Sequence, residues 1–98
     1  MQITPQASGV YVIAPTPFES GGAVDTASID RLAAFYAENG VAGTTVLGQL
    51  GEAPKLEHAE ALQVATRFIQ RSKTPTIVGV SAPGFAAMRA LARDAMDA

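Results

Sequence analysis

The stretch TVLGQLGEAPKL, residues 45–56, joins a short apolar run to a loop that holds two glycines, a carboxylate and a proline. Gly48 and Gly51 lack a Cβ, so each can adopt a positive φ or let another group approach the backbone closely. A segment with helical spacing of its apolar residues begins directly after the loop. This order of apolar run, glycine loop and amphipathic segment is typical of a strand that leads into a helix in a βα unit.

The same order occurs three times along the chain, at a spacing of roughly 30 residues, which is the size of a βα unit. Strands are predicted at residues 9–14, 44–47 and 76–80. Helices are predicted from the N-cap residue Asp25 to Gly40, over about residues 57–72, and after residue 84. The residues expected in the core are Tyr11 in the first strand, Ile29, Leu32, Ala33, Tyr36 and Ala37 in the first helix, Leu62, Ala65, Phe68 and Ile69 in the second, and Met88, Leu91, Ala92, Ala95 and Met96 in the third.

This alternation of strands and helices predicts an α/β fold. Strands that are almost continuously apolar and are each followed by a helix indicate a parallel sheet whose two faces are both covered. Three strands alone leave two unpaired edges and too little cover for the sheet. We therefore expect residues 1–98 to be the amino-terminal part of a longer (β/α) chain, with a self-contained small domain as the alternative.

Composition excludes several classes of protein. The chain has 98 residues, 48% of them hydrophobic, and a net charge of −2, without the basic patch that a nucleic-acid-binding protein needs. It has no cysteine and one histidine, His58, so neither a disulfide framework nor a metal site is expected. His58 is interpreted as an exposed residue of the second helix. No apolar run is long enough to span a membrane and no signal peptide is recognisable, so we expect a cytoplasmic protein without membrane contact.

The loops that follow the strands are where a site is expected, because active sites of parallel α/β proteins lie at the carboxyl ends of the strands. These loops are residues 15–24, 48–56 and 81–84, and the second is the most constrained. Its consecutive N–H groups, leading into a helix, are suited to bind a carboxylate or phosphate. The alternative is that Gly48 and Gly51 only allow a tight turn. For Thr16, the alternatives are a place at the pocket mouth and a hydrogen bond at the proline-broken strand end.

Five segments occur in an order and spacing that match a known family. They are TPF at residues 16–18, GAVD at 22–25, NGVAG at 39–43, GQLGE at 48–52 with Leu56 and Glu60 after it, and PTIVG at 75–79. In these features the chain resembles the amino-terminal part of the dihydrodipicolinate synthase and N-acetylneuraminate lyase family of class I aldolases. The segment GQLGE stands where that family has Gly-Thr/Ser-Thr-Gly-Glu.

The resemblance implies a (β/α)₈ barrel, of which this chain holds the first three βα units, and a homo-oligomer, either a dimer or a tetramer. It implies an enzyme with no metal or organic cofactor, which binds pyruvate or another 2-oxo acid as a Schiff base on a lysine. That lysine and a proton-handling tyrosine belong to the sixth and fifth strands of the family, which fall beyond Ala98. Lys55 and Lys73 are expected to be solvated, so this segment alone is expected to be inactive.

By the same resemblance, the two residues between the glycines hold the substrate carboxylate, and the first of them joins a hydroxyl relay. Here Gln49 is a poor proton relay and Leu50 has no side-chain donor. We therefore expect a lyase, aldolase or dehydratase relative rather than dihydrodipicolinate synthase itself, with Gln49 at the relay position. The predicted substrate-binding residues are Thr16, Gly48, Gln49, Leu50, Gly51 and Glu52.

Three alternatives stay open. The first is a non-catalytic relative that binds 2-oxo acids or serves in assembly and keeps the same barrel. The second is a small α/β module whose glycine loop binds a phosphorylated ligand, although the chain lacks the G-x-G-x-x-G spacing and the Walker-type lysine. The third concerns Glu52 alone, which either serves the site or stabilises the amino terminus of the following helix.

Overall fold

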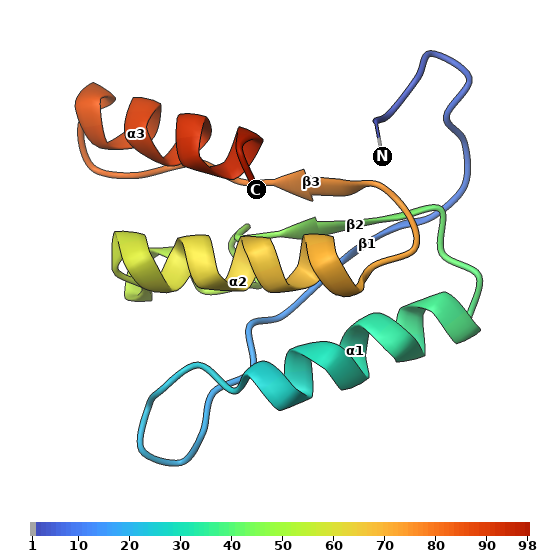
Figure 1. Cartoon of the computed structure of the whole chain (residues 1–98), viewed down its shortest axis with the longest axis horizontal. Helices are drawn as coiled ribbons and strands as arrows, with labels where there is room; N and C mark the ends of the chain where they lie inside the picture. The colour runs from blue at the N-terminus through green and yellow to red at the C-terminus, as the bar shows by residue number, and fades with distance from the viewer. Residues whose placement is uncertain (1) are drawn as a thin grey trace.

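The computed structural model describes residues 2–98 and contains three strands and three α-helices in strict alternation, with one short 3₁₀ helix. Their bounds are β1 (Tyr11–Ile13), α1 (Thr26–Glu38), β2 (Gly43–Val46), the 3₁₀ helix η1 (Ala53–Lys55), α2 (His58–Arg71), β3 (Thr76–Val78) and α3 (Phe85–Met96). The strands form one parallel sheet in the order β1-β2-β3 (Figure 1). The α/β fold predicted from the sequence is confirmed.

The helices begin and end where the sequence indicates. The Asp25 carboxylate caps α1 by accepting a hydrogen bond of 3.0 Å from the Ser28 N–H. Gly40, with φ +72°, follows the end of α1 in the left-handed conformation that glycine adopts without strain. At the start of α2, Glu57 and Glu60 form a reciprocal capping box.

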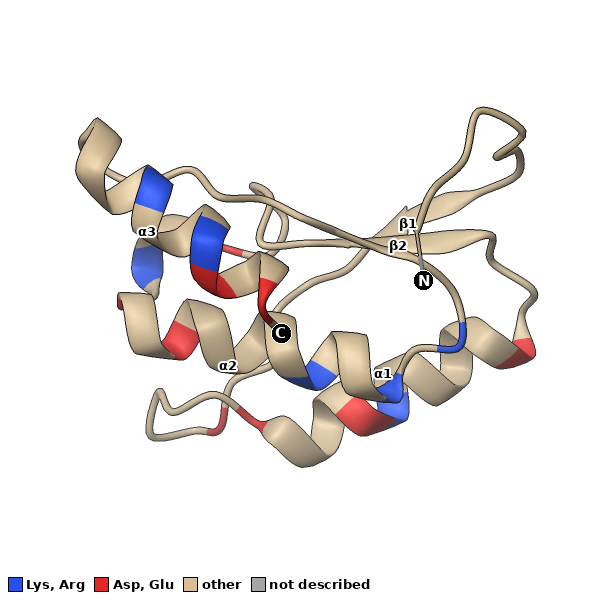
Figure 2. Ribbon diagram, turned by 45° about the horizontal axis from the view of Figure 1, so that its top comes forward, with Lys and Arg blue, Asp and Glu red and all other residues tan. Residues whose placement is uncertain are grey.

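All three helices lie on one side of the sheet (Figure 2). The side chains that face them alternate along the strands and include Val12, Thr44, Val46 and Val78. These strand residues pack against a core of helix residues. The fully buried side chains include Ile29 in α1, Val64, Ala65 and Phe68 in α2, and Thr44 and Val46 in β2.

Within residues 2–98, no helix covers the opposite face of the sheet. Ile13 and Ile77 lie on it, 53% and 40% exposed, on either side of Thr45 in the register. Tyr11 also lies on this face and is half-buried, outside the cluster of buried residues, so its predicted place in the core is not confirmed within residues 2–98. Its ring lies over Gly43, where an added Cβ would come within 2.3 Å of the ring. Glycine leaves room for the ring, and a larger residue at position 43 would have to displace it.

The predicted helix stripes are confirmed in part. Ile29, Ala33 and Tyr36 are buried, but Ala37 is exposed, because it lies on the edge of α1 that turns away from the sheet. In α2 the buried stripe is centred on Ala61, Val64, Ala65 and Phe68, while Leu62 and Ile69 are half-buried on its margins.

In α3 the buried residues are Leu91 and Ala95, whereas Met96 is 82% exposed, so its predicted place in the core is wrong. Met96 lines an open groove beside β3 together with Val80 and Ile69. None of the helices in residues 2–98 has the length and apolar character that crossing a membrane requires.

Candidate functional site

The loop of residues 48–52 follows β2 directly, at the carboxyl edge of the sheet, and is named the amide loop here. The loop after β1 lies beside it, since the Thr16 hydroxyl donates a hydrogen bond of 2.6 Å to the Gly51 carbonyl. β3 reaches the same edge, where Gly79 donates to the Val46 carbonyl at 2.9 Å. The three strand ends therefore meet at one place, as the parallel topology requires.

Most main-chain N–H groups of the amide loop make no hydrogen bond. Within residues 2–98, those of residues 48–51 donate to no carbonyl and to no side chain. The next two N–H groups are used inside the loop, because Glu52 donates to the Gln49 carbonyl at 3.0 Å and Ala53 donates to the Gly48 carbonyl at 3.4 Å. Successive unpaired main-chain N–H groups at a strand end are donors of the kind that bind an anion.

The left-handed positions of this loop are not its glycines. Leu47 has φ +61° and Glu52 has φ +56°, and these are the only non-glycine residues of the described chain with positive φ. Neither Gly48 nor Gly51 has a positive φ, so the turn at this loop does not depend on a left-handed glycine. A bulky residue held in the left-handed region is strained and marks a site of functional interest.

Close approach explains one of the two glycines. An added Cβ at Gly51 would lie 3.2 Å from the Leu47 nitrogen and 3.4 Å from the Ala14 carbonyl oxygen, so the loop folds back onto the end of β1. A Cβ at Gly48 would meet nothing within 4 Å. The space around the backbone is therefore tight for a larger residue at position 51 and open at position 48.

Gly79 packs against the strained peptide at Leu47. It was not identified as a site residue from the sequence. An added Cβ there would lie 2.4 Å from the Leu47 carbonyl oxygen, closer than real Cβ atoms come to another atom. β3 thus packs against the peptide that leads into the amide loop. The sequence signal was present, because Gly79 is a glycine inside the predicted third strand, residues 76–80.

Thr16 supports the amide loop and does not line an open pocket mouth. Its side chain is buried, at 7% exposure, and its hydroxyl donates to the Gly51 carbonyl. Of the two alternatives for this residue, a hydrogen bond near the strand end is therefore the one observed, and the acceptor lies on the neighbouring loop.

The side chains of the amide loop extend into solvent. Gln49 and Leu50 are exposed, Leu50 at 57%. The Glu52 carboxylate lies 3.4 Å from the Lys55 ammonium in an exposed pair. Gln49 makes no side-chain hydrogen bond within residues 2–98, and its relay role stays a prediction.

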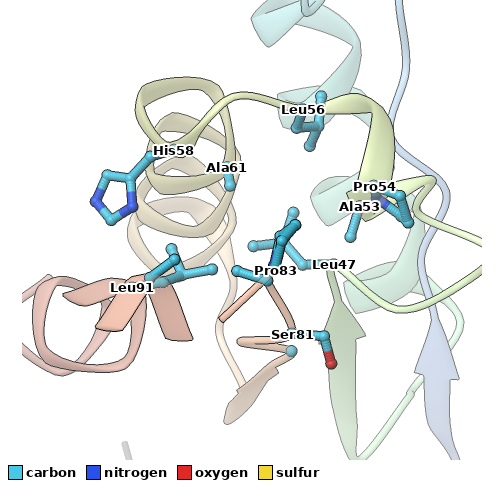
Figure 3. Close-up of a pocket in the computed structure, with 12 residues that line it drawn as sticks. Leu47, Ala53, Pro54, Leu56, His58, Ala61, Ser81, Pro83 and Leu91 are labelled. Carbon is cyan, nitrogen blue, oxygen red and sulfur yellow. The ribbon is translucent and has the colours of Figure 1, made fainter. Parts of the chain in front are cut away.

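An apolar cavity of about 450 Å³, lined in part by Leu47, lies between the start of α2, α3 and the loops after β2 and β3 (Figure 3). None of the predicted site residues lines it. At its rim, His58 Nε2 lies 2.7 Å from Asp94 Oδ2 and joins α2 to α3, a contact that the sequence did not indicate. His58 is exposed, as predicted. The lining residues drawn and labelled in the figure are Leu47, Ala53, Pro54, Leu56, His58, Ala61, Ser81, Pro83 and Leu91.

The sequence model of the Dihydrodipicolinate synthetase family matches residues 6–96. The chain belongs to this family. Among curated proteins of the family, it is 36% identical over 97 residues to a probable mitochondrial 4-hydroxy-2-oxoglutarate aldolase of Emericella nidulans, with 93% of this chain and 31% of that protein covered. The resemblance drawn from the GQLGE loop and its flanking segments is confirmed.

Solved structures of the family superpose closely on the chain. A dihydrodipicolinate synthase from Rhodopseudomonas palustris has a TM-score of 0.93 and 64% identity, over 99% of this chain and 33% of that one. A chloride-inhibited dihydrodipicolinate synthase from Acinetobacter baumannii, complexed with pyruvate, has a TM-score of 0.87 and 29% identity, over 94% of this chain and 32% of that one. The chain spans about a third of the length of these relatives, and its three βα units are the first three of the family's (β/α)₈ barrel.

Proposed function

We propose that the chain supplies the carboxylate-binding loop of a family enzyme that acts on pyruvate or another 2-oxo acid. The observation that carries this proposal is the run of free N–H groups at residues 48–51, at the edge of the sheet where the three strands end. A carboxylate is the common feature of all 2-oxo acids. Donors held in place by the fold bind it without the cost of ordering a flexible segment.

The chemistry of this loop differs from the family's usual one. Two exposed residues, Gln49 and Leu50, stand where the family has hydroxyl residues, so the main-chain donors carry the binding here. A hydrogen bond to a charged group contributes roughly 1.5–3 kcal/mol, so each main-chain donor is a substantial part of the affinity. The apolar Leu50 side chain lies beside those donors, and it favours a 2-oxo acid with an apolar substituent over a 2-oxo acid with a polar substituent.

The covalent step needs a lysine that this segment does not offer. The Lys55 side chain is 71% exposed, and Lys73 is exposed as well, as predicted. A Schiff-base lysine must be unprotonated at neutral pH, which requires desolvation or neighbouring positive charge. We infer that the reacting lysine lies outside residues 1–98, on the sixth strand of the barrel, and that the segment alone is inactive.

Trapping of the imine tests the proposal. In the whole protein, the lysine amine attacks the C2 carbonyl of pyruvate, water leaves, and borohydride reduces the resulting C=N bond to a stable secondary amine. Mass spectrometry is expected to find one pyruvate-derived adduct for each chain, and none with lactate, which has the carboxylate but no ketone. Absence of an adduct with pyruvate and with larger 2-oxo acids would contradict a Schiff-base enzyme.

A second candidate is a relative that binds 2-oxo acids without turning them over. The exposed amide and isobutyl side chains of Gln49 and Leu50 favour it, because neither can relay a proton as a hydroxyl does. Calorimetric titration with pyruvate separates the two candidates: saturable binding without a trapped adduct identifies the non-catalytic protein.

A homo-oligomer, as the resemblance implies, is also proposed. Light scattering on the purified protein measures its oligomeric state.

A further inference from the structure

We infer that Thr16 is a positioning residue of the amide loop, whose buried hydroxyl holds the free N–H groups of residues 48–51 in the geometry that receives a carboxylate. The inference rests on the proposed function and adds a residue that touches no substrate. Its basis is the hydrogen bond of 2.6 Å from the Thr16 hydroxyl to the Gly51 carbonyl, which joins two loops 35 residues apart.

The amide loop needs support from outside itself. One hydrogen bond of 3.0 Å, from Glu52 to Gln49, lies inside it, and a second, from Ala53 of η1 to Gly48, is long at 3.4 Å. It begins after Leu47 and ends at Glu52, both in the left-handed conformation. Residues in that conformation persist only when their surroundings hold them there.

The hydrogen bond from the Thr16 side chain is one of the contacts that hold the amide loop in place. Within residues 2–98, no other side-chain hydrogen bond reaches the main chain of residues 47–51. The remaining support is steric, from the close packing of Gly51 on Ala14 and of Gly79 on Leu47. Packing limits how far the loop moves, whereas a hydrogen bond sets the direction of a peptide plane.

Thr16 is itself held firmly. It lies between Pro15 and Pro17, whose rings fix φ, and its side chain is 7% exposed. Gly51 is also buried. Loss of the hydroxyl therefore leaves the Gly51 carbonyl without its partner, and the peptide turns to find another. Because the free donors precede that peptide directly, their direction changes with it, and pre-organised binding is lost.

A pair of substitutions in the whole protein tests this inference. Thr16→Val keeps the shape of the side chain and removes the donor, and Thr16→Ser keeps the donor. The dissociation constant for pyruvate, measured by calorimetry well below the melting temperature, is expected to rise roughly 5- to 30-fold in Thr16→Val, which corresponds to the loss of about one hydrogen bond, and to return toward wild type in Thr16→Ser. Thr74→Val, at the opposite end of β3, is expected to bind as wild type does.

A merely structural role would lower the melting temperature of Thr16→Val and leave the dissociation constant unchanged, and that result overturns the inference. If the wild-type protein binds no 2-oxo acid, the proposed function is wrong, and a crystal structure of Thr16→Val decides the positioning role instead. A rotated Gly51–Glu52 peptide supports it, and a main chain at residues 47–52 that superposes on wild type refutes it.

Discussion

Leu47 adopts a backbone conformation that a bulky side chain pays a free-energy cost to reach. Its φ is +61° and its side chain is 3% exposed, in the core beneath the amide loop. The buried side chain anchors the residue, and the packing of Gly79 on its carbonyl prevents the peptide from relaxing. Strain of this kind costs of order 1–3 kcal/mol and is retained where the surrounding contacts fix it.

The substitution Gly79→Ala is expected to lower the free energy of unfolding by about 1–3 kcal/mol, because the new Cβ would lie 2.4 Å from the Leu47 carbonyl oxygen and the backbone must shift. Gly79 has no positive φ, so the effect is steric. Urea unfolding of the purified protein measures it. Gly48→Ala is the matched control, with open space around its Cβ and a change within about 0.5 kcal/mol. Equal stabilities of the two variants would remove Gly79 from the support of the loop.

At the scale of single residues, the sequence predicts where the candidate site lies but not the backbone conformation of its residues. The GQLGE motif identified the loop and its place after a strand, and Thr16 was named as a candidate. The conformations of Leu47 and Glu52 were not predictable, because glycines stand beside them and local propensity assigns positive φ to glycine. Tertiary contacts from β1 and β3 decide those dihedral angles, and a single sequence does not display such contacts.

Among the helices, α1 and α2 are joined by a bidentate ion pair. Arg67 donates from Nε to Asp30 Oδ1 at 2.7 Å and from a terminal nitrogen to Oδ2 at 2.6 Å. Arg71 Nε lies 3.4 Å from the same carboxylate. The hydrogen bond from Arg67 is the main cause that lowers the pKa of Asp30 below its ordinary value, with the positive charges of both arginines adding to it.

The ion pair makes the stability of the protein depend on acid pH. The pKa of Asp30 is lower in the folded state than in the unfolded state, where it is about 3.9. The ion pair therefore contributes its full stabilisation above that unfolded pKa, and the stabilisation is lost as the pH falls from there through the folded pKa. Asp30→Asn is therefore expected to be less stable than wild type at pH 7, with the difference shrinking below about pH 4. Urea unfolding at a series of pH values measures this.

Asp97→Asn is the control for that series, since Asp97 is exposed and has no ion pair within residues 2–98. Its stability is expected to follow wild type at every pH. A wild-type advantage over Asp30→Asn that persists unchanged at pH 2 would show that the ion pair is not its source.

Element types and helix caps were predictable because their signals are local. Asp25 and Gly40 delimit α1, and the apolar spacing places Ile29, Tyr36 and Phe68 in the core. Pairings between elements were not predictable in the same way. The Asp30–Arg67 and His58–Asp94 contacts join residues 37 and 36 positions apart, and charged residues on helix faces are ordinarily solvated.

At the scale of the whole sheet, residues 2–98 leave one face covered and one face open. The covered face packs on the three helices, and the open face presents Ile13, Thr45 and Ile77 in register across the strands. In a (β/α)₈ barrel the helices form the outer ring and the opposite face of each strand fills the interior with branched side chains. We therefore expect the open face to become the barrel interior in the whole protein.

Ile77→Lys tests this arrangement. Ile77 is 40% exposed in residues 2–98, and if it were equally exposed in the whole protein, the substitution would change the stability little. In a closed barrel the lysine has no partner and no water, and the substitution is expected to cost roughly 3–5 kcal/mol of unfolding free energy or to prevent folding of the whole protein. Gln70→Lys, on the exposed side of α2, is the control and is expected to change stability by less than about 0.5 kcal/mol. If the whole protein tolerates a lysine at residue 77 as well as one at residue 70, the open face points to solvent and the strands do not close around it.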